Sequence, residues 1–374
     1  MVLSIKQVIL TSVLSVLAFA VQAQTQKVEV LEYHPAPGQF VNTLPAADEN
    51  STQDDVNQGC EEQLSGDGLV HLGTYGGYIT VKFDHPIENK PGSDILILGN
   101  GFYSNADPIY GKETIGGSIE PGIVYVGVGK NLEEAKWYEL AGSEYYTSEI
   151  HDFQITYYKP TAESGDHTQF SSSYDKYIKW ECSWTDKNGE HRDSTGYHMK
   201  NVSHKQTFWP IWEGKDELTF KGGKLPNNAI ETSGKGTYWI QYRYAKDAYG
   251  YVDASPATDS LYSSFDINWA VDDEGNQVVL DHIDFIRVKT GIFQYCGWLG
   301  ETSTEINSIA DLHLIEGYDD KPFVITPRQR PTTGITRPTI HVVEDDIYYN
   351  LMGQRVLNLV KGHIYVHKGR KVIY

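Results

Sequence analysis

The stretch Tyr177-Ile-Lys-Trp-Glu-Cys-Ser-Trp184 alternates apolar and polar residues with a period of two. Its apolar positions are Ile178, Trp180, Cys182 and Trp184. Successive side chains of a strand point to opposite faces, so this stretch predicts a β-strand with one buried and one solvent-facing side. Cys182 falls on the apolar side, which indicates a buried small hydrophobe and not half of a disulfide.

The same alternation recurs at residues 78–83, 123–128, 153–158, 237–244, 265–272 and 283–288. Residues 94–98 form a continuous apolar run after a Pro-Gly turn, which is typical of a fully buried strand. Helical periodicity is confined to 131–136 and 308–314. The 35 Gly and 26 Tyr agree with this pattern, because Gly supplies turns and aromatic residues suit a pleated surface. The sequence therefore predicts an all-β protein built as a two-sheet sandwich.

Charge and hydropathy exclude two classes of protein. The chain carries 31 Lys and Arg against 50 Asp and Glu, a net charge of -19. A nucleic-acid-binding protein needs a surplus of cations to replace the counterions of the phosphates, so no nucleic-acid partner is expected. The mean hydropathy is -0.43, and no run of roughly 18 apolar residues follows the N-terminus. An integral membrane protein is therefore not expected either.

The first 23 residues have the pattern of an export signal. Lys6 precedes an apolar stretch over residues 8–21, and small residues stand before Gln24. The stretch is too short to span about 30 Å of hydrocarbon as a permanent anchor. We expect cleavage after Ala23 and an exported protein that is secreted or associated with the cell surface or outer membrane. The odd number of cysteines allows at most one disulfide, and none is expected to be essential.

Composition changes after residue 316 and divides the chain. Residues 24–316 carry the alternating strands, whereas 317–338 lose the alternation and collect four prolines, which indicates a linker. From Asn350 onward there are five cations and no acid. We therefore expect 339–374 to be a separate small C-terminal β module.

Several strings in the body of the chain are too specific to be explained by composition. They include Gly73-Thr-Tyr-Gly-Gly-Tyr-Ile-Thr-Val, Trp137-Tyr-Glu-Leu-Ala-Gly-Ser, Ser264-Phe-Asp-Ile-Asn-Trp-Ala-Val-Asp and Cys296-Gly-Trp-Leu-Gly-Glu-Thr-Ser-Thr-Glu. Together they resemble a family of exported cell surface proteins of Bacteroidetes over about residues 30–314. Their order is also similar to that in galactose-binding-like jelly rolls, with about residues 160–235 as an insertion. The resemblance implies a jelly-roll type β-sandwich that binds a ligand.

The tail contains Tyr349-Asn-Leu-Met-Gly-Gln-Arg-Val and Lys361-Gly-His-Ile-Tyr-Val-His-Lys-Gly-Arg-Lys-Val. These strings resemble C-terminal domains of Bacteroidetes exported proteins, some of which are sorting signals for type IX secretion. The two resemblances imply a sorting or docking module on a surface protein of an uptake system, with an outer-membrane transporter complex as partner. The ligand would be a glycan or a nutrient cofactor such as a corrinoid. The resemblance also implies a loop similar to a calcium-binding loop just before the Trp-Tyr-Glu-Leu string. Residues 129–136 of this chain lack the alternating oxygen ligands of such a loop, so calcium is not expected there.

Some aromatic residues lie in turn-rich segments outside the alternating strands. A ring held by a rigid loop suits stacking on a sugar or another planar ligand, and a nearby acid would fix the ligand's orientation. We expect these rings to be exposed and to form the ligand-binding site. The expected residues are Trp209, Trp212, Tyr249, Tyr251 and Trp298, with Glu301 as the polar group. The alternative is that such rings close the end of the core.

Oxygen-bearing side chains at the ends of predicted strands are candidates for a metal site. Asp94, Asn100, Glu120 and Asp266 offer hard oxygen ligands. A structural calcium ion that pins loops at one edge of the sandwich would use such ligands. The alternative is that Asp and Asn cap turns.

Motifs for familiar catalytic chemistry are missing from the sequence, which has no Gly-x-Ser-x-Gly elbow, His-Glu-x-x-His or phosphate loop. Paired carboxylates for sugar chemistry are not set by sequence spacing, so a carbohydrate-active enzyme, a glycoside hydrolase or lyase, is the alternative function. Its first candidates are Glu120, Glu139, Glu144 and Asp266. The leading hypothesis is an exported, surface-associated, non-enzymatic binding protein.

Overall fold

Short antiparallel strands make up almost all of the described chain. The computed structural model describes residues 26–66, 68–103, 116–161, 174–201, 206–257, 260–315 and 318, together with four strands of the tail. Within these residues, every strand pairing is antiparallel and α2 (Gln53–Ser65) is the one α-helix. The prediction of an all-β sandwich is confirmed. No helix among these residues is long and apolar enough to cross a membrane.

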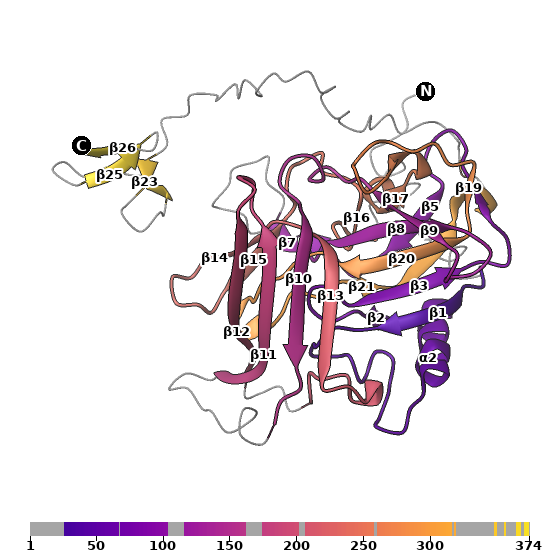
Figure 1. Cartoon of the computed structure of the whole chain (residues 1–374), viewed down its shortest axis with the longest axis horizontal. Helices are drawn as coiled ribbons and strands as arrows, with labels where there is room; N and C mark the ends of the chain where they lie inside the picture. Colours follow the sequence, from indigo (N-terminus) through magenta and orange to yellow (C-terminus); the bar gives the residue numbers. More distant parts are fainter. Residues whose placement is uncertain are drawn as a thin grey trace, which may run out of the picture. The chain divides into compact units, whose positions relative to one another are not determined.

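The largest sheet, here called the main sheet, has seven strands (Figure 1). Its strand order is β1 (Glu29–His34), β3 (Tyr78–Lys82), β20 (Phe285–Thr290), β8 (Gly122–Val128), β9 (Lys136–Leu140) and β18 (Ala270–Val271), and β16 (Tyr251–Val252) pairs with β8. Val81 and Ile286 are cross-strand partners and are buried on what we call the inner face. Thr80 and Arg287, the next pair in register, lie on the outer face.

The inner face of the main sheet packs on three smaller groups of strands. They are the sheet of β17 (Ser264–Phe265), β5 (Ile95–Leu98) and β22 (Ser308–Asp311), the pair β2 (Val70–His71) with β21 (Glu305–Ile306), and the pair β4 (Ile87–Glu88) with β19 (His282–Ile283). Ile95, Ile97 and Ile309 join the same apolar cluster as Val81 and Ile286. The apolar run predicted at 94–98 is therefore a core strand.

A four-stranded sheet packs on part of the outer face (Figure 1). Its order is β12 (His191–Asn201), β11 (Tyr174–Thr185), β10 (Ile150–Tyr158) and β13 (Glu217–Lys224). Ile178 and Cys182 of β11 are buried, and Trp180 and Trp184 are half-buried against the same apolar cluster, so these four residues share the face that the alternation predicts. Lys289 of the main sheet donates from Nζ to the carbonyl of Lys221 on β13 (3.1 Å), which joins the two sheets. Strands β11, β12 and β13 lie within the expected insertion.

The β11–β12 hairpin ends in a tight turn at the surface. Asp186 N donates to the carbonyl of Glu190, and Gly189 N donates to the carbonyl of Asp186, both at 2.8 Å. Gly189 has a φ of 79°, which side-chain-bearing residues rarely adopt. A Cβ added at Gly189 would have no atom within 4 Å, so the turn projects into solvent.

The remaining elements are short. One further sheet has the order β14 (Ala229–Glu231), β15 (Trp239–Tyr242), β7 (Gly116–Ser118) and β6 (Phe102–Tyr103). The 3-10 helices are η1 (Ile211–Glu213), η2 (Ser260–Ser263), η3 (Ile267–Trp269), η4 (Gly297–Leu299) and η5 (Leu312–Leu314). Cys60, Cys182 and Cys296 are buried free thiols.

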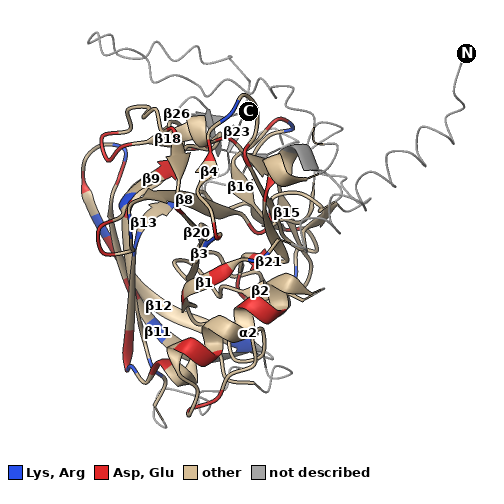
Figure 2. Cartoon of the chain, turned by 90° about the vertical axis from the view of Figure 1, so that its right-hand side faces the viewer, with Lys and Arg blue, Asp and Glu red and all other residues tan. Residues whose placement is uncertain are grey.

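Helix α2 is not predicted by alternation, yet its sequence carries a helix signal. Thr52 accepts from Asp55 N, and the Asp55 carboxylate accepts from Thr52 N, which completes a capping box. Val56, Cys60 and Leu64 then follow at a spacing of four and are buried against the main sheet. Acidic residues recur along the solvent side of this helix (Figure 2).

Three predicted elements differ from the structure. The strand expected at 265–272 is divided into β17, η3 and β18, because the Asp266 side chain accepts from Asn268 N and starts a helical turn. Residues 131–136 form no helix, only turns that lead into β9. Residues 308–314 begin as β22, paired with β5, and only the end becomes the short helix η5.

The chain divides into two compact units, Met1–Arg330 and Pro331–Tyr374, and this boundary falls within the expected linker at 317–338. In the second unit, the strands follow the order β24 (Arg355–Val356), β23 (Tyr348–Tyr349), β25 (Ile364–His367) and β26 (Arg370–Ile373). The expected export signal at 1–23 and nearly all of the linker lie outside the described residues.

Candidate functional site

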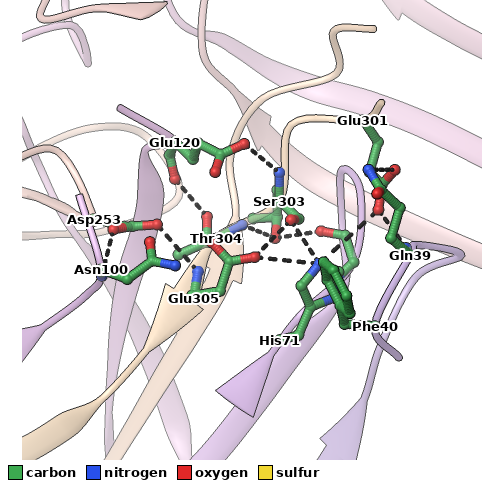
Figure 3. A network of polar contacts seen from close by, with 12 residues as sticks. Gln39, Phe40, His71, Asn100, Glu120, Asp253, Glu301, Ser303, Thr304 and Glu305 are labelled. Atoms are coloured by element: carbon green, nitrogen blue, oxygen red, sulfur yellow. Dashed lines mark hydrogen bonds and ion pairs between the residues drawn. The ribbon is translucent and has the colours of Figure 1, made fainter. Parts of the chain in front are cut away.

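A network of buried polar side chains lies where β2, β21, β16 and the start of β8 meet (Figure 3). Glu120 stands two residues before β8, and Asp253 directly follows β16. Because β16 pairs with the first residues of β8, these two acids are brought together, and Glu120 N donates to the Asp253 carbonyl (3.0 Å). Glu305, the first residue of β21, joins them through its own N–H, which donates to Asp253 Oδ2 (3.2 Å). We call Glu120, Asp253 and Glu305 the carboxylate cluster.

Protein donors hold each carboxylate of the cluster in place. Asp253 Oδ1 accepts from the backbone N–H groups of Asn100 (2.9 Å) and Gly101 (2.8 Å). Glu120 Oε1 accepts from the N–H of Ser303 (3.2 Å), and Glu305 Oε1 accepts from the Ser303 hydroxyl (2.8 Å). Ser303 therefore connects two of the three acids. One carboxylate oxygen from each of the three residues lies within 4.8 Å of the others.

Glycine permits the close approach around Asp253. A Cβ at Gly99 would overlap Asp253 Oδ1, and one at Gly101 would lie 3.3 Å from the same oxygen. Asp253 itself has a φ of 57°, and among the described residues it is the one non-glycine residue with a positive φ. Short polar residues such as Asp tolerate this left-handed conformation better than most. The backbone here is thus shaped around the Asp253 carboxylate.

Burial raises the pKa of every member of the carboxylate cluster. Desolvation and then the charge of Asp253 raise the pKa of Glu120 to about 8. Burial raises the pKa of Asp253 to about 7, although three backbone N–H groups oppose the shift. For Glu305, burial and the charges of Glu120 and Asp253 move the pKa well above its ordinary range. A cation bound between the three carboxylates would oppose all three pKa shifts, because its charge would offset the repulsion between the carboxylates.

The neighbouring histidine does not form a catalytic pair with serine. The N–H of Gly73 donates to His71 Nδ1 (3.2 Å), so this nitrogen is an acceptor and Nε2 carries the proton. His71 Nε2 then donates to Ser303 Oγ (2.8 Å) and cannot take a proton from it as a general base. Burial lowers the pKa of His71 to about 4, which keeps the ring neutral. Ser303 and His71 are positioned to hold Glu305, since His71 Nε2 is also 3.2 Å from Glu305 Oε1.

Glu301, expected to orient a ligand, is buried beside this network. Its Oε1 accepts from Gln39 N (2.5 Å), and its Oε2 lies 3.7 Å from His198 Nε2 on β12. Burial raises the pKa of Glu301, but the contact with His198 and the proximity of His71 outweigh it and bring the pKa to about 2. Glu301 is thus a buried anion that links β12 to the N-terminal segment.

Four of the five aromatic residues expected at the ligand site are buried, so the expectation that they are exposed is wrong for these four. Trp209 is 1% and Tyr251 2% exposed, and Trp212 and Tyr249 are 9% exposed each. They belong to three separate apolar clusters and do not form one platform. The side chain of Trp298, within η4, lies outside the described residues.

A physical reason for the burial of Trp209 is visible in the loop that carries it. The N-terminal segment packs over this loop, where Asn42 Nδ2 donates to the carbonyl of Trp209 (2.8 Å) and Gly38 N donates to that of Phe208 (2.8 Å).

Tyr249 and Tyr251 line a small cavity of about 10 Å³, which has room for about one water molecule and not for a sugar.

The four residues expected to hold calcium are divided between two places. Glu120 is in the carboxylate cluster, and Asn100 reaches it through its backbone N–H. Asp94 instead accepts from the N–H groups of Lys90 (2.8 Å) and Ile267 (2.9 Å), and Asp266 caps η3. Asp266 is therefore a turn cap, whereas Asp94 also contacts His313 Nε2 (2.9 Å). Asp253 and Glu305 were not expected, and no spacing in the sequence connects them with Glu120.

The acids considered for catalysis also separate. Glu139 and Glu149 lie together, buried between the main sheet and β10, with Lys289 near both. Burial raises the pKa of Glu149 to about 7 and lowers that of Lys289 to about 8. Glu144 lies in a turn, where the hydroxyl of Ser148 donates to it (2.5 Å). Neither Glu139 nor Glu149 lines a described cavity that a substrate could enter.

An open hollow of about 440 Å³ lies at the uncovered end of the outer face of the main sheet. It is formed by the ends of β1, β3 and β20 together with the loops after β3 and β8. Its lining residues are Leu31, Lys82, Phe83, Asp84, His85, Pro86, Gly129, Lys130, Asn131, Leu132, Asp284 and Phe285. None of the residues expected at the ligand site takes part in it.

Comparison with known proteins gives no relative, since no protein-family model and no curated protein matches the chain.

Proposed function

We propose that this chain is an exported, surface-associated binding protein without catalytic activity, and that it recognises a neutral polyhydroxylated ligand, such as the sugar unit of a glycan, in the hollow. The single observation that carries this proposal is the hollow of about 440 Å³. Ligand sites of small molecules commonly have volumes of about 300–1,000 Å³. The export signal and the tail that resembles a sorting domain support the surface location.

The lining of the hollow suits a sugar. Phe285 and Phe83 supply an apolar floor, and Leu132 stands at the edge in the loop after β8. A sugar ring presents apolar C–H faces as well as hydroxyl groups, so it needs both kinds of surface. A corrinoid is several times larger than a sugar ring and would extend beyond the hollow, which favours the glycan.

Charge in the hollow is balanced and favours a neutral ligand. Two lysines, Lys82 and Lys130, and two aspartates, Asp84 and Asp284, line the hollow. Lys82 Nζ also pairs with Glu29, which is not part of the lining (3.1 Å). Hydroxyl groups donate and accept hydrogen bonds, so a polyhydroxylated ligand can use both signs of charge. An anionic ligand would leave the aspartates unpaired at a cost.

The enzyme alternative has less support. A glycosidase needs two carboxyl groups that flank the substrate, with separations of about 5–5.5 Å or about 6.5–9.5 Å. Glu139 and its close neighbour Glu149 are buried away from both described cavities, and Glu120 belongs to the carboxylate cluster, which lines neither of them. The carboxylates that do line the hollow are Asp84, which bonds to His85 (2.6 Å), and Asp284, which accepts from Gly129 N (2.8 Å).

The test is isothermal titration calorimetry of the full chain with a panel of neutral mono- and disaccharides and with cyanocobalamin. We expect at least one sugar to bind and cyanocobalamin not to bind. Lys130→Ala and Leu132→Ala should weaken sugar binding about tenfold, roughly 1.4 kcal/mol. Glu133→Ala is the matched control, because it lies in the same loop outside the lining. Equal affinity in all three variants, or no sugar bound at all, would contradict the proposal.

A further inference from the structure

We propose that the carboxylate cluster of Glu120, Asp253 and Glu305 binds a calcium ion. This inference stands on the geometry of the cluster and does not depend on the ligand hollow. It differs from the sequence expectation in its residues, because only Glu120 is common to both.

The first observation is the spacing of the oxygens. One carboxylate oxygen from each residue lies within 4.8 Å of the other two. Calcium binds oxygen at about 2.3–2.6 Å, so two oxygens on opposite sides of one ion are roughly 5 Å apart at most. The three oxygens are therefore close enough to one another to share a single ion.

The second observation is an oxygen without a partner. Glu305 is 6% exposed, and its Oε2 is buried with no hydrogen bond, while its Oε1 is held by Ser303 and His71. A buried carboxylate oxygen left unpaired is costly. Among the described residues, no Lys or Arg forms an ion pair with Glu120, Asp253 or Glu305. A cation bound by this oxygen would remove the cost.

The third observation is preorganisation by neutral donors. The N–H groups of Asn100 and Gly101 fix Asp253, and Ser303 fixes both Glu120 and Glu305. Hydrogen bonds from such outer partners orient metal ligands, and losing one commonly costs about 10- to 100-fold in affinity. Protein donors outside the cluster therefore fix the orientation of all three carboxylates.

The donor set selects calcium among common cations. All the candidate ligand atoms are carboxylate oxygens, and hard oxygen ligands without sulfur or imidazole nitrogen suit calcium and magnesium. Magnesium requires oxygens at about 2.0–2.1 Å in an octahedron, whereas calcium accepts wider and irregular arrangements. Carboxylates fixed by protein donors have little freedom to form a regular octahedron, which favours calcium.

The test is calorimetry of the EDTA-treated full chain with Ca²⁺ alone, and with Mg²⁺ and Zn²⁺ as comparators. We expect one calcium per chain, with magnesium and zinc weaker, and a melting temperature that rises in millimolar calcium. Glu305→Gln and Asp253→Asn should each weaken calcium binding at least tenfold and abolish the calcium-dependent rise. Asp54→Asn, which removes one exposed acid from α2, is the matched control and should leave both unchanged.

A second measurement separates a lost ligand from a misfolded variant. Without calcium, Glu305→Gln should melt at or above the temperature of the unchanged protein, because it relieves repulsion within the cluster. Absence of a calcium heat in the unchanged protein, or tighter binding of zinc than of calcium, would overturn the proposal. So would a calcium affinity that both cluster variants retain.

Discussion

Replacing Trp209 with alanine should lower the free energy of unfolding and leave the affinity for a ligand unchanged. Its ring is 1% exposed within the apolar cluster beneath β10, β11 and β13, so the whole side chain leaves a cavity. Loss of a large aromatic residue from a core costs about 3–5 kcal/mol. The hydrogen bond from Trp209 Nε1 to the Lys215 carbonyl (3.2 Å) is lost as well. At roughly 2–4 °C per kcal/mol, the melting temperature should fall by about 6–20 °C.

Urea denaturation and calorimetry of the purified full chain would measure this loss. Tyr238→Ala is the control, because Tyr238 is 48% exposed and its removal should change the free energy of unfolding by less than about 0.5 kcal/mol. A loss below about 1 kcal/mol for Trp209→Ala, accompanied by weaker sugar binding, would refute the reasoning. The ring would then face a ligand in solution.

Three other predictions test the interior, the cluster and the tail. Burial raises the pKa of Glu149 from 4.5 to about 7, so the contribution of this carboxyl group to the free energy of unfolding is present below pH 4.5 and is lost as the pH rises through 7. The unchanged protein should therefore lose stability between pH 5 and 8. In Glu149→Gln, denaturation should show a loss over this range that is smaller by up to roughly 3 kcal/mol. Gly99→Ala should displace the Asp253 carboxylate and weaken calcium binding about tenfold or more, and equal calorimetric affinity would contradict the site. A chain ending at Pro338 should melt within a few degrees of the full chain but fail to appear on the cell surface, and its display there would exclude a sorting role for the tail.

Alternation alone predicts the strands well, because a period of two is a local property that burial on one face imposes directly. The inward residues Val81, Ile178, Cys182 and Ile286 all follow it. Helix α2 depends on a different period, yet the capping box at Thr52 is present in the sequence and could identify it.

The candidate sites are far less predictable from the sequence. Glu120 is identified by its position at a strand end, but Asp253 and Glu305 reach it only because β16 pairs with β8 and Glu305 N bonds to Asp253. The position of Trp209 in a turn gives no information on exposure, because the N-terminal segment that covers its loop is distant in sequence. Long-range packing, which local pattern does not encode, decides both cases.

The projecting turn of the β11–β12 hairpin offers a practical attachment point. An epitope or a fluorescent protein could be inserted after Gly189, where an added Cβ has no atom within 4 Å and the surrounding residues are solvent-exposed. Loop insertions of this kind add little closure entropy even when they are long. The protein could therefore be immobilised or imaged by this turn while its termini stay native, which would allow display on living cells to be followed without masking either end.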